Sequence, residues 1–440
     1  MIKQKLIGSG FCFAASPFCQ QQGMRRQKQL ILLPKIKIQL LMLKTSVTAT
    51  VNNPHHSEGS VMTKLHPIAS ACLAGFLLTS PATLAVDFSW SGFLTLGLGK
   101  SLSGSVQGPN EIGFDCPCMI ADFSQAGVYE DSWSLNPDSK LGLQGSVMFN
   151  DNLSLTGQIV SRGSRDFAVN LEWVYLSYQL NDNNTLQLGR KRLPLFYYSE
   201  QQDVGFTYPW VHLPGQTYGW EVVNYNGVNW AHSLQIGDWS GIINTFAGSE
   251  TRKDGEYSKI YSGLNSESDT RWSGIVGAEL VMSKNWFEGR LMLMQSDTQG
   301  RLVSEGEDWS AKAKQQIYGA SALVDYQDYL LSAELFFSDR TESYGRDLAY
   351  TLSVGRRFDN LLVFLTHGMY QQKLYANNPA EVGEDDREKH RNSSVVLKYD
   401  VSASAAVKLQ FDHWQDFSGS WFKQTYGDAN TLSLSYDRVF

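Results

Sequence analysis

The chain has 440 residues and a formal net charge of −7, with 37 Lys and Arg against 44 Asp and Glu. Only 18% of its residues are charged, 12% are aromatic, and no uninterrupted apolar run reaches the ~20 residues that a membrane-spanning helix needs. The acidic balance argues against nucleic acid as a partner.

Residues 62–85 have the order of a secretory signal peptide. Lys64 stands near the start, an apolar run follows over residues 68–78, and small residues precede a cleavage site that we expect after Ala85. Residues 1–61 would then lie upstream of an export signal, so we interpret them as a disordered extension produced by a mispredicted start. A basic amphipathic leader is the alternative.

Removal of residues 1–85 would leave 28 Lys and Arg against 43 Asp and Glu, a net charge of −15. Of the five Cys residues only Cys116 and Cys118 would remain, which suits an oxidising compartment and little reliance on disulfides. The pair could form a local disulfide across Pro117, and a redox role is the alternative. Two thiols alone make an incomplete metal site, so we expect no metal and no cofactor.

From Asp87 onward, stretches of about ten residues alternate apolar with polar or small side chains. This period of two is typical of strands with one face on lipid and the other on a water-filled lumen. Sixteen such strands can be counted, so the predicted fold class is all-β, a transmembrane antiparallel β-barrel. The predicted strands are residues 87–100, 139–150, 152–162, 168–180, 185–192, 227–237, 240–249, 271–283, 286–296, 316–327, 328–338, 347–358, 361–372, 392–403, 404–415 and 429–440.

The predicted connections alternate strictly between short and long. The short ones are rich in Asn, Asp, Gly and Ser, as tight hairpins require, and the long ones are polar. Short periplasmic turns on one rim and long extracellular loops on the other produce this asymmetry, whereas a soluble β-sandwich, the alternative, has no reason for it. The main long connections are residues 101–138, 193–226, 250–270, 297–315, 373–391 and 416–428.

Charged side chains of the strands should point inward, because an outward Arg or Lys at mid-bilayer costs about 2 to 4 kcal/mol. One predicted strand does not allow its faces to be assigned in this way. Residues 361–372 are apolar on both parities, so neither face can be assigned to lipid.

The last twelve residues, 429–440, carry a family resemblance. They end on Phe440, with Tyr436 on the same apolar parity, and this ending resembles the closing strand of Gram-negative outer-membrane β-barrels, where it is the assembly signal. Arg438 departs from the pattern, because the family often has another aromatic residue there. The parity expected to face lipid is Leu432, Leu434, Tyr436 and Phe440, and the parity expected to face the lumen is Ser433, Ser435 and Asp437.

Across residues 86–440 the architecture resembles the sixteen-stranded trimeric porins of gammaproteobacteria. The resemblance implies an outer-membrane location, a homotrimer, insertion by the barrel-assembly machinery, contact with lipopolysaccharide, and passage of small hydrophilic or anionic solutes. It also implies that the connection after the fifth strand, here about residues 193–226, folds into the lumen as a constriction loop. No motif in the sequence defines a substrate.

The predicted constriction brings together charges of both signs. A basic wall that faces an acidic loop would create a transverse field that orders polar solutes. The alternative is that the basic residues Arg190, Lys191 and Arg192 pair with lipopolysaccharide phosphates. The pore candidates are Arg162, Lys191, Arg192, Glu200, Asp203, Arg290, Glu334 and Lys408.

The loop is also rich in aromatic residues, of which Tyr197, Tyr198, Tyr208 and Trp210 are the candidates for solute contact. They could form a stacking track for sugar rings, or they could pack the loop against the barrel wall.

The sequence therefore predicts a porin for passive diffusion of small solutes and ions. The alternatives are a porin specific for sugars or anions, and a non-conducting adhesin or phage receptor whose loops carry the function. An enzyme is not expected, because the His residues are scattered without a nucleophile motif. An acidic run in one loop is interpreted as solvated surface, or alternatively as a site where divalent cations bridge to lipopolysaccharide. The run is Glu381, Glu384, Asp385, Asp386 and Glu388, and the His residues are His212, His232, His367, His390 and His413.

Overall fold

The computed structural model describes residues 87–341, 345–373 and 387–440. The expected extension and signal peptide, residues 1–85, lie outside the described residues, as do Glu381, Glu384, Asp385 and Asp386 of the acidic run. Within the described ranges, no helix has the length and apolar character needed to cross a membrane.

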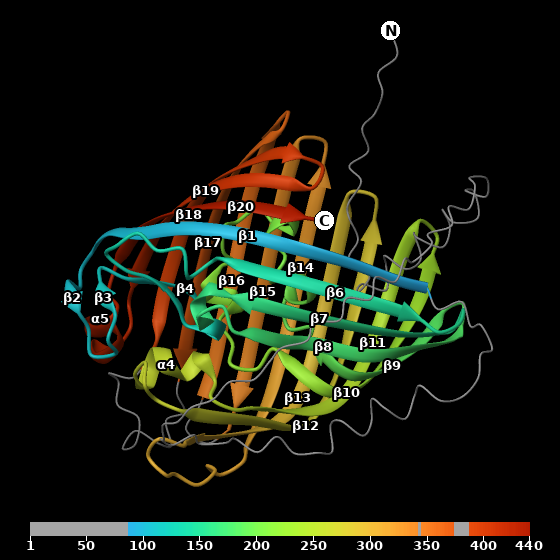
Figure 1. Ribbon diagram of the computed structural model, residues 1–440, viewed down its shortest axis with the longest axis horizontal. Helices are drawn as coiled ribbons and strands as arrows, with labels where there is room; N and C mark the ends of the chain where they lie inside the picture. Colours follow the sequence, from blue (N-terminus) through green and yellow to red (C-terminus); the bar gives the residue numbers. More distant parts are fainter. Residues whose placement is uncertain (1–86, 342–344, 374–386) are drawn as a thin grey trace, which may run out of the picture. The chain divides into compact units, whose positions relative to one another are not determined.

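Among the described residues, sixteen antiparallel strands form one closed barrel in which sequence neighbours pair (Figure 1). Every strand predicted from the sequence overlaps one of them, so the predicted count and fold class are confirmed, with ends shifted by a few residues. The strands are β1 (Asp87–Gly104), β6 (Lys140–Met148), β7 (Leu153–Arg162), β8 (Val169–Asn181), β9 (Asn184–Arg192), β10 (Asn224–Ile236), β11 (Trp239–Arg252), β12 (Ser268–Lys284), β13 (Phe287–Leu302), β14 (Ala313–Tyr326), β15 (Tyr329–Arg340), β16 (Gly345–Phe358), β17 (Leu361–Lys373), β18 (Lys389–Ser402), β19 (Ala405–Asp416) and β20 (Ala429–Val439).

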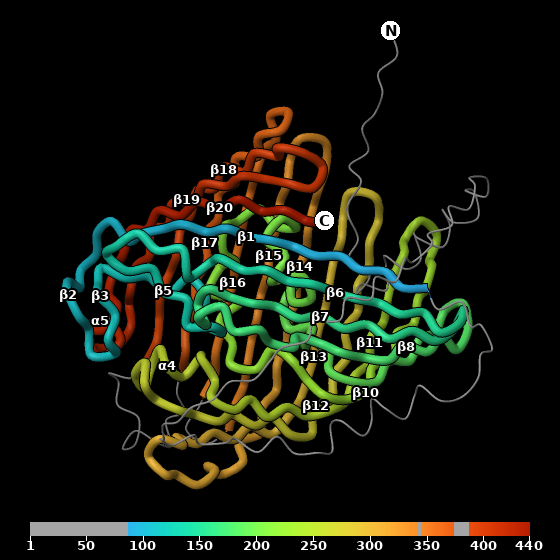
Figure 2. Tube along the Cα trace, in the orientation of Figure 1, coloured from blue at the N-terminus to red at the C-terminus, as the bar shows by residue number. Residues whose placement is uncertain are grey.

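The barrel closes between its first and last strands. One edge of β1 pairs with β20 and the other edge with β6. Beyond the paired residues, two backbone hydrogen bonds of 2.8 and 3.0 Å join Gly92 to Phe440. Figure 2 shows the blue β1 and the red β20 side by side, although they stand at opposite ends of the described chain. Closure leaves no strand edge of the barrel unpaired.

Turns and loops occupy opposite rims of the barrel. Two-residue turns connect β8 to β9, β10 to β11 and β18 to β19. The link between β15 and β16 is shorter than the strict alternation predicts, because β15 runs on to Arg340 and β16 already begins at Gly345. The longer connections include L1 (residues 105–139), L2 (163–168), L3 (193–223), L4 (253–267), L5 (303–312) and L8 (417–428).

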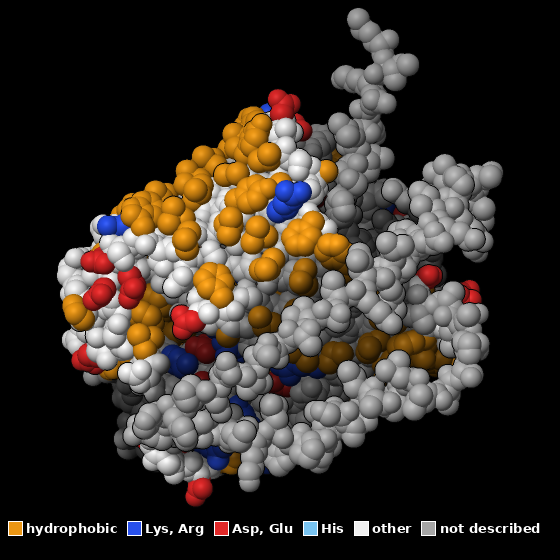
Figure 3. Space-filling view, viewed as in Figure 1, with side chains coloured by type: hydrophobic (Ala, Val, Ile, Leu, Met, Phe, Trp, Pro, Cys, Tyr) orange, Lys and Arg blue, Asp and Glu red, His pale blue; other side chains and the backbone are white. Residues whose placement is uncertain are grey.

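The two faces of the wall differ as the alternation predicts. On β20, Ser433, Ser435 and Asp437 point inward and are at most 1% exposed, whereas Leu434 on the outer face is 40% exposed. Figure 3 shows hydrophobic side chains gathered over the outer face of β1 and of the last strands. Such a band of apolar side chains is what a wall in contact with lipid requires.

The strand with two apolar faces, β17, contacts protein on one of them. Leu362 and Phe364 point inward and are 7% and 0% exposed, while Leu365 on the outer face is 48% exposed. The ring of Phe364 lies 5.3 Å from the ring of Trp210 in L3. The inner face of β17 is apolar because a loop inside the barrel packs against it.

L1 folds on itself and packs with L4 and L8. Its short strands pair as β2 (Gly108–Pro109) with β3 (Asp115–Cys116), and as β4 (Met119–Asp122) with β5 (Gly127–Tyr129). Phe123 of L1, Ile260 of α4 and Phe422 of α5 belong to one buried apolar cluster. Helix α4 is Glu256–Ser262 in L4, and α5 is Ser420–Thr425 in L8. The three loops therefore share a core.

Candidate functional site

L3 lies inside the barrel. Its two ends are joined where Leu193 donates its N–H to the carbonyl of Val223 (2.8 Å). Between them the chain forms the short helical turns η3 (Ser199–Gln201), η4 (Gly205–Thr207) and α3 (Gly215–Tyr218). Inward-facing side chains on opposite sides of the barrel hold this segment.

On one side, Arg290 of β13 and Glu334 of β15 hold the start of L3. Arg290 donates to the carbonyls of Pro194 (2.7 Å) and Tyr197 (3.0 Å). Glu334 accepts the backbone N–H of Tyr197 (2.9 Å) and the hydroxyl of Tyr218 (2.6 Å). Charge-assisted hydrogen bonds of this kind are stronger than neutral ones, so the loop start is firmly fixed.

On the other side, a buried quartet of charges holds the middle of L3. Asp203 lies 2.6 Å from Arg192 and 2.8 Å from Arg162, and these guanidinium groups also bind Glu172 at 2.9 and 2.6 Å. Burial opposes the charge on Asp203, but the two guanidinium groups outweigh it and hold the pKa of this carboxyl below its usual range. Removing one partner of a buried charge group costs about 3 to 5 kcal/mol, so the quartet fixes the loop.

Lys408 of β19 holds L3 at η4. Its ammonium group donates to the carbonyls of Gly205 (2.6 Å) and Trp210 (2.7 Å) and lies 3.0 Å from Asp437 of β20. Gly205 is required here by space, because a Cβ atom would lie 2.1 Å from Asp437 Oδ1 and 2.7 Å from Thr95 Oγ1. The backbone of L3 therefore lies directly on the seam between β1 and β20.

The aromatic candidates of L3 are mostly covered by protein. Tyr198, Tyr208 and Trp210 are 6%, 1% and 1% exposed, and Tyr197 is partly buried against the same apolar cluster. The indole N–H of Trp210 donates to Thr366 of β17 (2.8 Å). This placement favours packing of the loop over a stacking track for sugar rings.

The longest partly exposed stretch of L3 is residues 200–202. Burial raises the pKa of Glu200, and the nearby ammonium group of Lys191 on β9 opposes this rise. Lys191 also donates to Gln187 and lies 5.2 Å above the ring of Tyr175. Lys140 of β6 donates to the carbonyl of Gln202 in the same stretch (3.3 Å).

A buried histidine joins L3 to L1 and to the wall. The imidazole nitrogens of His212 lie 3.1 Å from Asp138 of L1 and 3.3 Å from Asp412 of β19. Tyr129 donates its hydroxyl to Asp138 (2.6 Å). Burial opposes protonation, but the two carboxylates raise the pKa of His212 to about 10. In the sequence His212 is one of several scattered histidines. Its position in a loop predicted to enter the lumen is the signal that could have identified it as a functional residue.

All eight charged pore candidates lie on L3 or interact with it. Most of them hold the loop. The sequence suggested one basic wall facing one acidic loop, whereas in the structure these residues form separate groups. Arg190, the neighbour of two candidates, pairs with Glu250 of β11 at 2.8 Å. The groups are Arg290 with Glu334, Arg162 and Arg192 with Asp203, Lys191 with Glu200, and Lys408 with Asp437.

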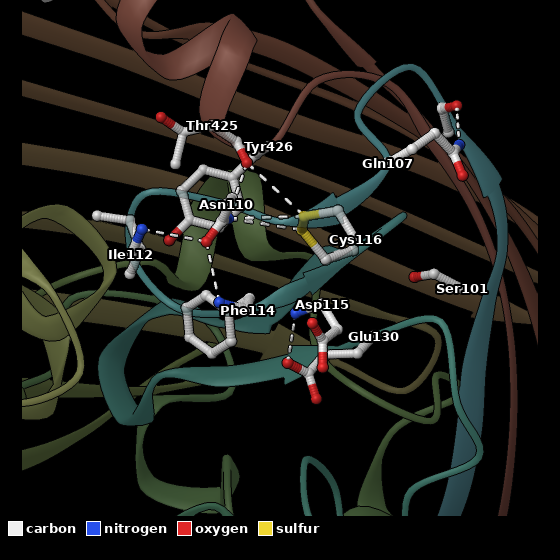
Figure 4. Close-up of a disulfide and its surroundings, with 12 residues drawn as sticks. Ser101, Gln107, Asn110, Ile112, Phe114, Asp115, Cys116, Glu130, Thr425 and Tyr426 are labelled. Carbon is white, nitrogen blue, oxygen red and sulfur yellow. Dashed lines mark hydrogen bonds between the residues drawn. A yellow bond between two sulfur atoms is a disulfide. The ribbon is translucent and has the colours of Figure 1, made fainter.

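Cys116 and Cys118 form a disulfide with an S–S bond of 2.04 Å in L1. Figure 4 shows Asn110 beside it. The side-chain oxygen of Asn110 accepts the backbone N–H groups of residues 112–114, and its Nδ2 donates to the carbonyl of Thr425 in L8 (2.8 Å). Asn110 therefore joins the disulfide-bearing turn to L8.

Comparison with known proteins identifies the fold. No family model and no curated protein matches the chain. Among solved structures, the outer membrane channel DcaP of Acinetobacter baumannii matches with a TM-score of 0.52 and 12% identity over 81% of this chain and 97% of that one. A Salmonella typhi OmpF complex with daunomycin matches with a TM-score of 0.51 and 12% identity over 80% and 97%. The trimer form of OmpT, an outer membrane protein of Vibrio cholerae, matches with a TM-score of 0.51 and 8% identity over 81% and 99%. These likenesses concern the fold: the chain is a closed sixteen-stranded barrel of the outer-membrane porin type.

Proposed function

We propose that the protein is an outer-membrane channel through which small hydrophilic solutes and ions diffuse passively, with L3 as its constriction. The observation that carries the proposal is the attachment of L3 to opposite walls, through Arg290 on one side and through Asp203 and Lys408 on the other. A loop fixed at both sides narrows the lumen at a constant place, which a selective channel needs.

The solute path that we propose runs beside L3 along β6 to β9. The inner face of these strands carries amide and hydroxyl groups joined in rows: Gln158 donates to Gln144 (3.3 Å), Gln187 to Ser177 (3.2 Å) and Asn229 of β10 to Gln187 (3.2 Å). These side chains are 1 to 5% exposed and pair with one another, so this part of the wall is polar. The inner face from β10 to β18 contributes instead to the apolar cluster packed around L3.

Charges of both signs lie near residues 200–202 of L3. Arg290 is neutralised by Glu279 at 2.5 Å, and Lys191 interacts with Glu200. Two further charges of opposite sign belong to this group: Glu288 of β13, and Lys140 of β6, which donates to the carbonyl of Gln202 (3.3 Å). A change in this balance would shift the local concentration of cations, so the ion preference of variants tests the proposed constriction.

The conductance of the purified protein in planar lipid bilayers tests the channel. We expect discrete conductance steps, grouped in threes for a homotrimer. Folded protein is recognised by its heat-modifiable migration in gels. Folded protein without conductance would overturn the channel.

The second candidate is a closed barrel whose loops bind a partner at the cell surface. It is favoured by the shared core of L1, L4 and L8, in which Tyr426 donates its hydroxyl to the carbonyl of Ile260 (2.6 Å). Ordered loops at the rim present a stable surface, as an adhesin or phage receptor requires. Absence of conductance together with binding by the intact loops would support this candidate.

The protein must be exported and inserted into the outer membrane before it can act as a channel. We propose that residues 62–85 are removed as a signal peptide, that the barrel-assembly machinery inserts the chain, and that lipopolysaccharide surrounds it. N-terminal sequencing of the mature protein should find Val86 first. A mature chain that begins at Met1 would refute the processing step.

A further inference from the structure

Helix α4 of L4 lies across the loop-bearing mouth of the barrel. L4 leaves the wall at the end of β11 and returns to it at β12, yet α4 forms hydrogen bonds with L8 and with the residue before β18. In the order of the closed sheet, the five strands β13 to β17 separate β12 from β18 on one side, and eight strands separate β11 from β18 on the other. L4 therefore reaches a part of the wall that is nearly opposite its own strands.

Two hydroxyl groups hold the far end of α4, and we call their hydrogen bonds the latch bonds. Tyr261 of α4 donates to Oε2 of Glu388 (2.9 Å), and Tyr426 of L8 donates to the carbonyl of Ile260 in α4 (2.6 Å). Glu388 is itself fixed, because its Oε1 lies 2.8 Å from Nε2 of His390 on β18. The latch bonds therefore attach α4 to ordered groups of the opposite wall and of L8.

The other aromatic face of α4 lies close to L3 and the inner wall. Burial raises the pKa of Tyr257 in α4, the nearby carboxylates of Glu221 in L3 and of Glu388 add to this rise, and the guanidinium group of Arg340 on β15 opposes it. Arg340 lies 3.9 Å from Glu221. The helix thus stands between the mouth and the loop in the lumen.

Polar side chains of the inner wall are covered near this mouth. Ser338 of β15, Asp347 of β16 and Thr431 of β20 face inward close to the loop-bearing ends of their strands, and all three are 0% exposed. Water would reach such side chains in a barrel that is open at this level. The mouth is therefore closed over these strands.

Glycines flank the helix on both sides. The seven residues of α4 stand between Gly255 and Gly263. Gly263 has a φ of +103°, which L side chains rarely adopt, and a Cβ atom there would meet open space. Hinges of moving loops are a few residues that absorb changes of φ and ψ at the ends of an element. Gly255 and Gly263 have the positions that such hinges need.

We propose that L4 is a gate for the loop-bearing mouth, closed while the latch bonds are formed. When the bonds break, α4 turns about its flanking glycines, leaves the residues before β18, and uncovers the way to L3. The inference rests on the proposed channel function and names the element that opens it. L3 then sets the width of the passage, and L4 sets the fraction of time for which solutes can enter.

Removal of the two latch hydroxyls tests the gate in planar lipid bilayers. Tyr261→Phe and Tyr426→Phe should each raise the ratio of open to closed time about fivefold, because each removes one hydrogen bond of the closed state only. The height of the conductance steps should stay the same. Tyr318→Phe is the matched control, since its hydroxyl donates to Gln316 on the outer face of β14 (3.3 Å). Ratios within twofold of this control would overturn the proposal.

A covalent link across the mouth tests the same gate in the opposite direction. Tyr261→Cys combined with Glu388→Cys lacks one latch bond and should open more often than the parent. A short bismaleimide that joins the two thiols should then abolish the openings, whereas either single variant treated with the reagent should stay open. Cys116 and Cys118 do not react, because they form a disulfide. Conductance that persists unchanged after cross-linking would overturn the proposal.

A labelling experiment separates failure of the gate from failure of the channel. If neither the parent nor any variant conducts, the channel fails, and the gate is tested alone with Ser338→Cys. Ser338 stands one inward position deeper than Arg340, and its hydroxyl has no hydrogen-bond partner among the described residues. A small water-soluble maleimide should modify the new thiol at least fivefold faster when Tyr261→Phe and Tyr426→Phe are added. Equal rates would overturn the gate. Heat-modifiable migration shows that each variant is folded.

Discussion

The ammonium group of Lys408 lies 3.0 Å from the carboxylate of Asp437, and neither side chain is exposed. The same ammonium group donates to two carbonyls of L3. One cation thus joins the last two strands of the barrel to the loop in its lumen. The loop and the wall are therefore coupled through a small number of buried charges.

Replacing Lys408 with Met should destabilise the barrel, because it leaves the buried carboxylate of Asp437 without its cation. The expected loss is about 3 to 5 kcal/mol. The free energy of unfolding in urea, followed by tryptophan fluorescence in micelles, measures it. Lys284→Met is the control, because it removes the cation of an exposed pair with Asp238 (3.2 Å) and should cost at most about 1 kcal/mol. Similar losses in both variants would contradict the role of Lys408.

Reversing the charge of Lys191 should increase the preference for cations. Lys191→Glu adds negative charge beside the exposed side of L3, so the reversal potential in a tenfold salt gradient should move towards the cation limit of about 59 mV. Glu200→Lys should move it in the opposite direction. Asp238→Lys, in a turn at the periplasmic rim, should leave it nearly unchanged, and an equal shift there would show that the constriction lies elsewhere.

His212 should make stability depend on pH above neutrality. Its pKa is about 10 in the folded protein, against about 6.5 for an unperturbed histidine. Because the folded pKa is the higher one, the stabilisation is complete below pH 6.5, declines as the pH rises towards 10, and is lost above it. Midpoints of thermal unfolding from pH 6 to pH 10 measure this decline.

His212→Gln should flatten that part of the pH profile and lower stability by a few kcal/mol at pH 6. The comparison variant is His413→Gln on the outer face, which should keep the slope of the parent. An unchanged slope in His212→Gln would mean that other groups facing Asp138 and Asp412 titrate instead.

Asn110→Ala should loosen L1 and L8 together, because the side chain accepts three backbone N–H groups of L1 and donates to Thr425 of L8. Limited proteolysis of the folded barrel should cut both loops at least severalfold faster. Gln107→Ala is the control from the same loop, since Gln107 is exposed and donates only to the carbonyl of Gly104 (2.8 Å). Faster cutting of L1 alone would show that Asn110 does not join the loops.

Phe440→Ala should reduce assembly in cells more than folding in vitro. The ring is 48% exposed and lies 6.2 Å from the ring of Trp90, so it contributes little to the packed interior. We expect several times less barrel in the outer membrane and near-parental folding into detergent. A large folding defect in vitro would instead give Phe440 a structural role.

The wall was predictable from the sequence because the parity of side chains along a strand is a local property. The alternation of Leu434 with Ser433 and Ser435 is visible in the chain itself. The resemblance to porins predicts a long connection after the fifth strand, which is where L3 stands in the chain. The two faces of β17 could not be told apart from the sequence. Its inward-facing Phe364 packs against Trp210 of L3, and the sequence of the strand does not show this contact.

The pairing of charges inside the barrel was not predictable. Parity shows that Arg162 points inward, but not that it binds Asp203 and Glu172, because the partner depends on the stagger of strands and the path of L3. The site of His212 needs Asp138, 74 residues earlier, and Asp412 on a distant strand. Such partners are set by tertiary structure.

Gly205 rests on Thr95 and Asp437, which are hydrogen-bonded to each other across the seam between β1 and β20 (2.6 Å). This surface comes into existence only when the first strand has met the last. During folding, this contact of L3 can therefore form only together with the closing of the sheet or after it. A barrel that has not closed would therefore lack this contact of L3 in its interior, and β1 and β20 would each have an unpaired edge.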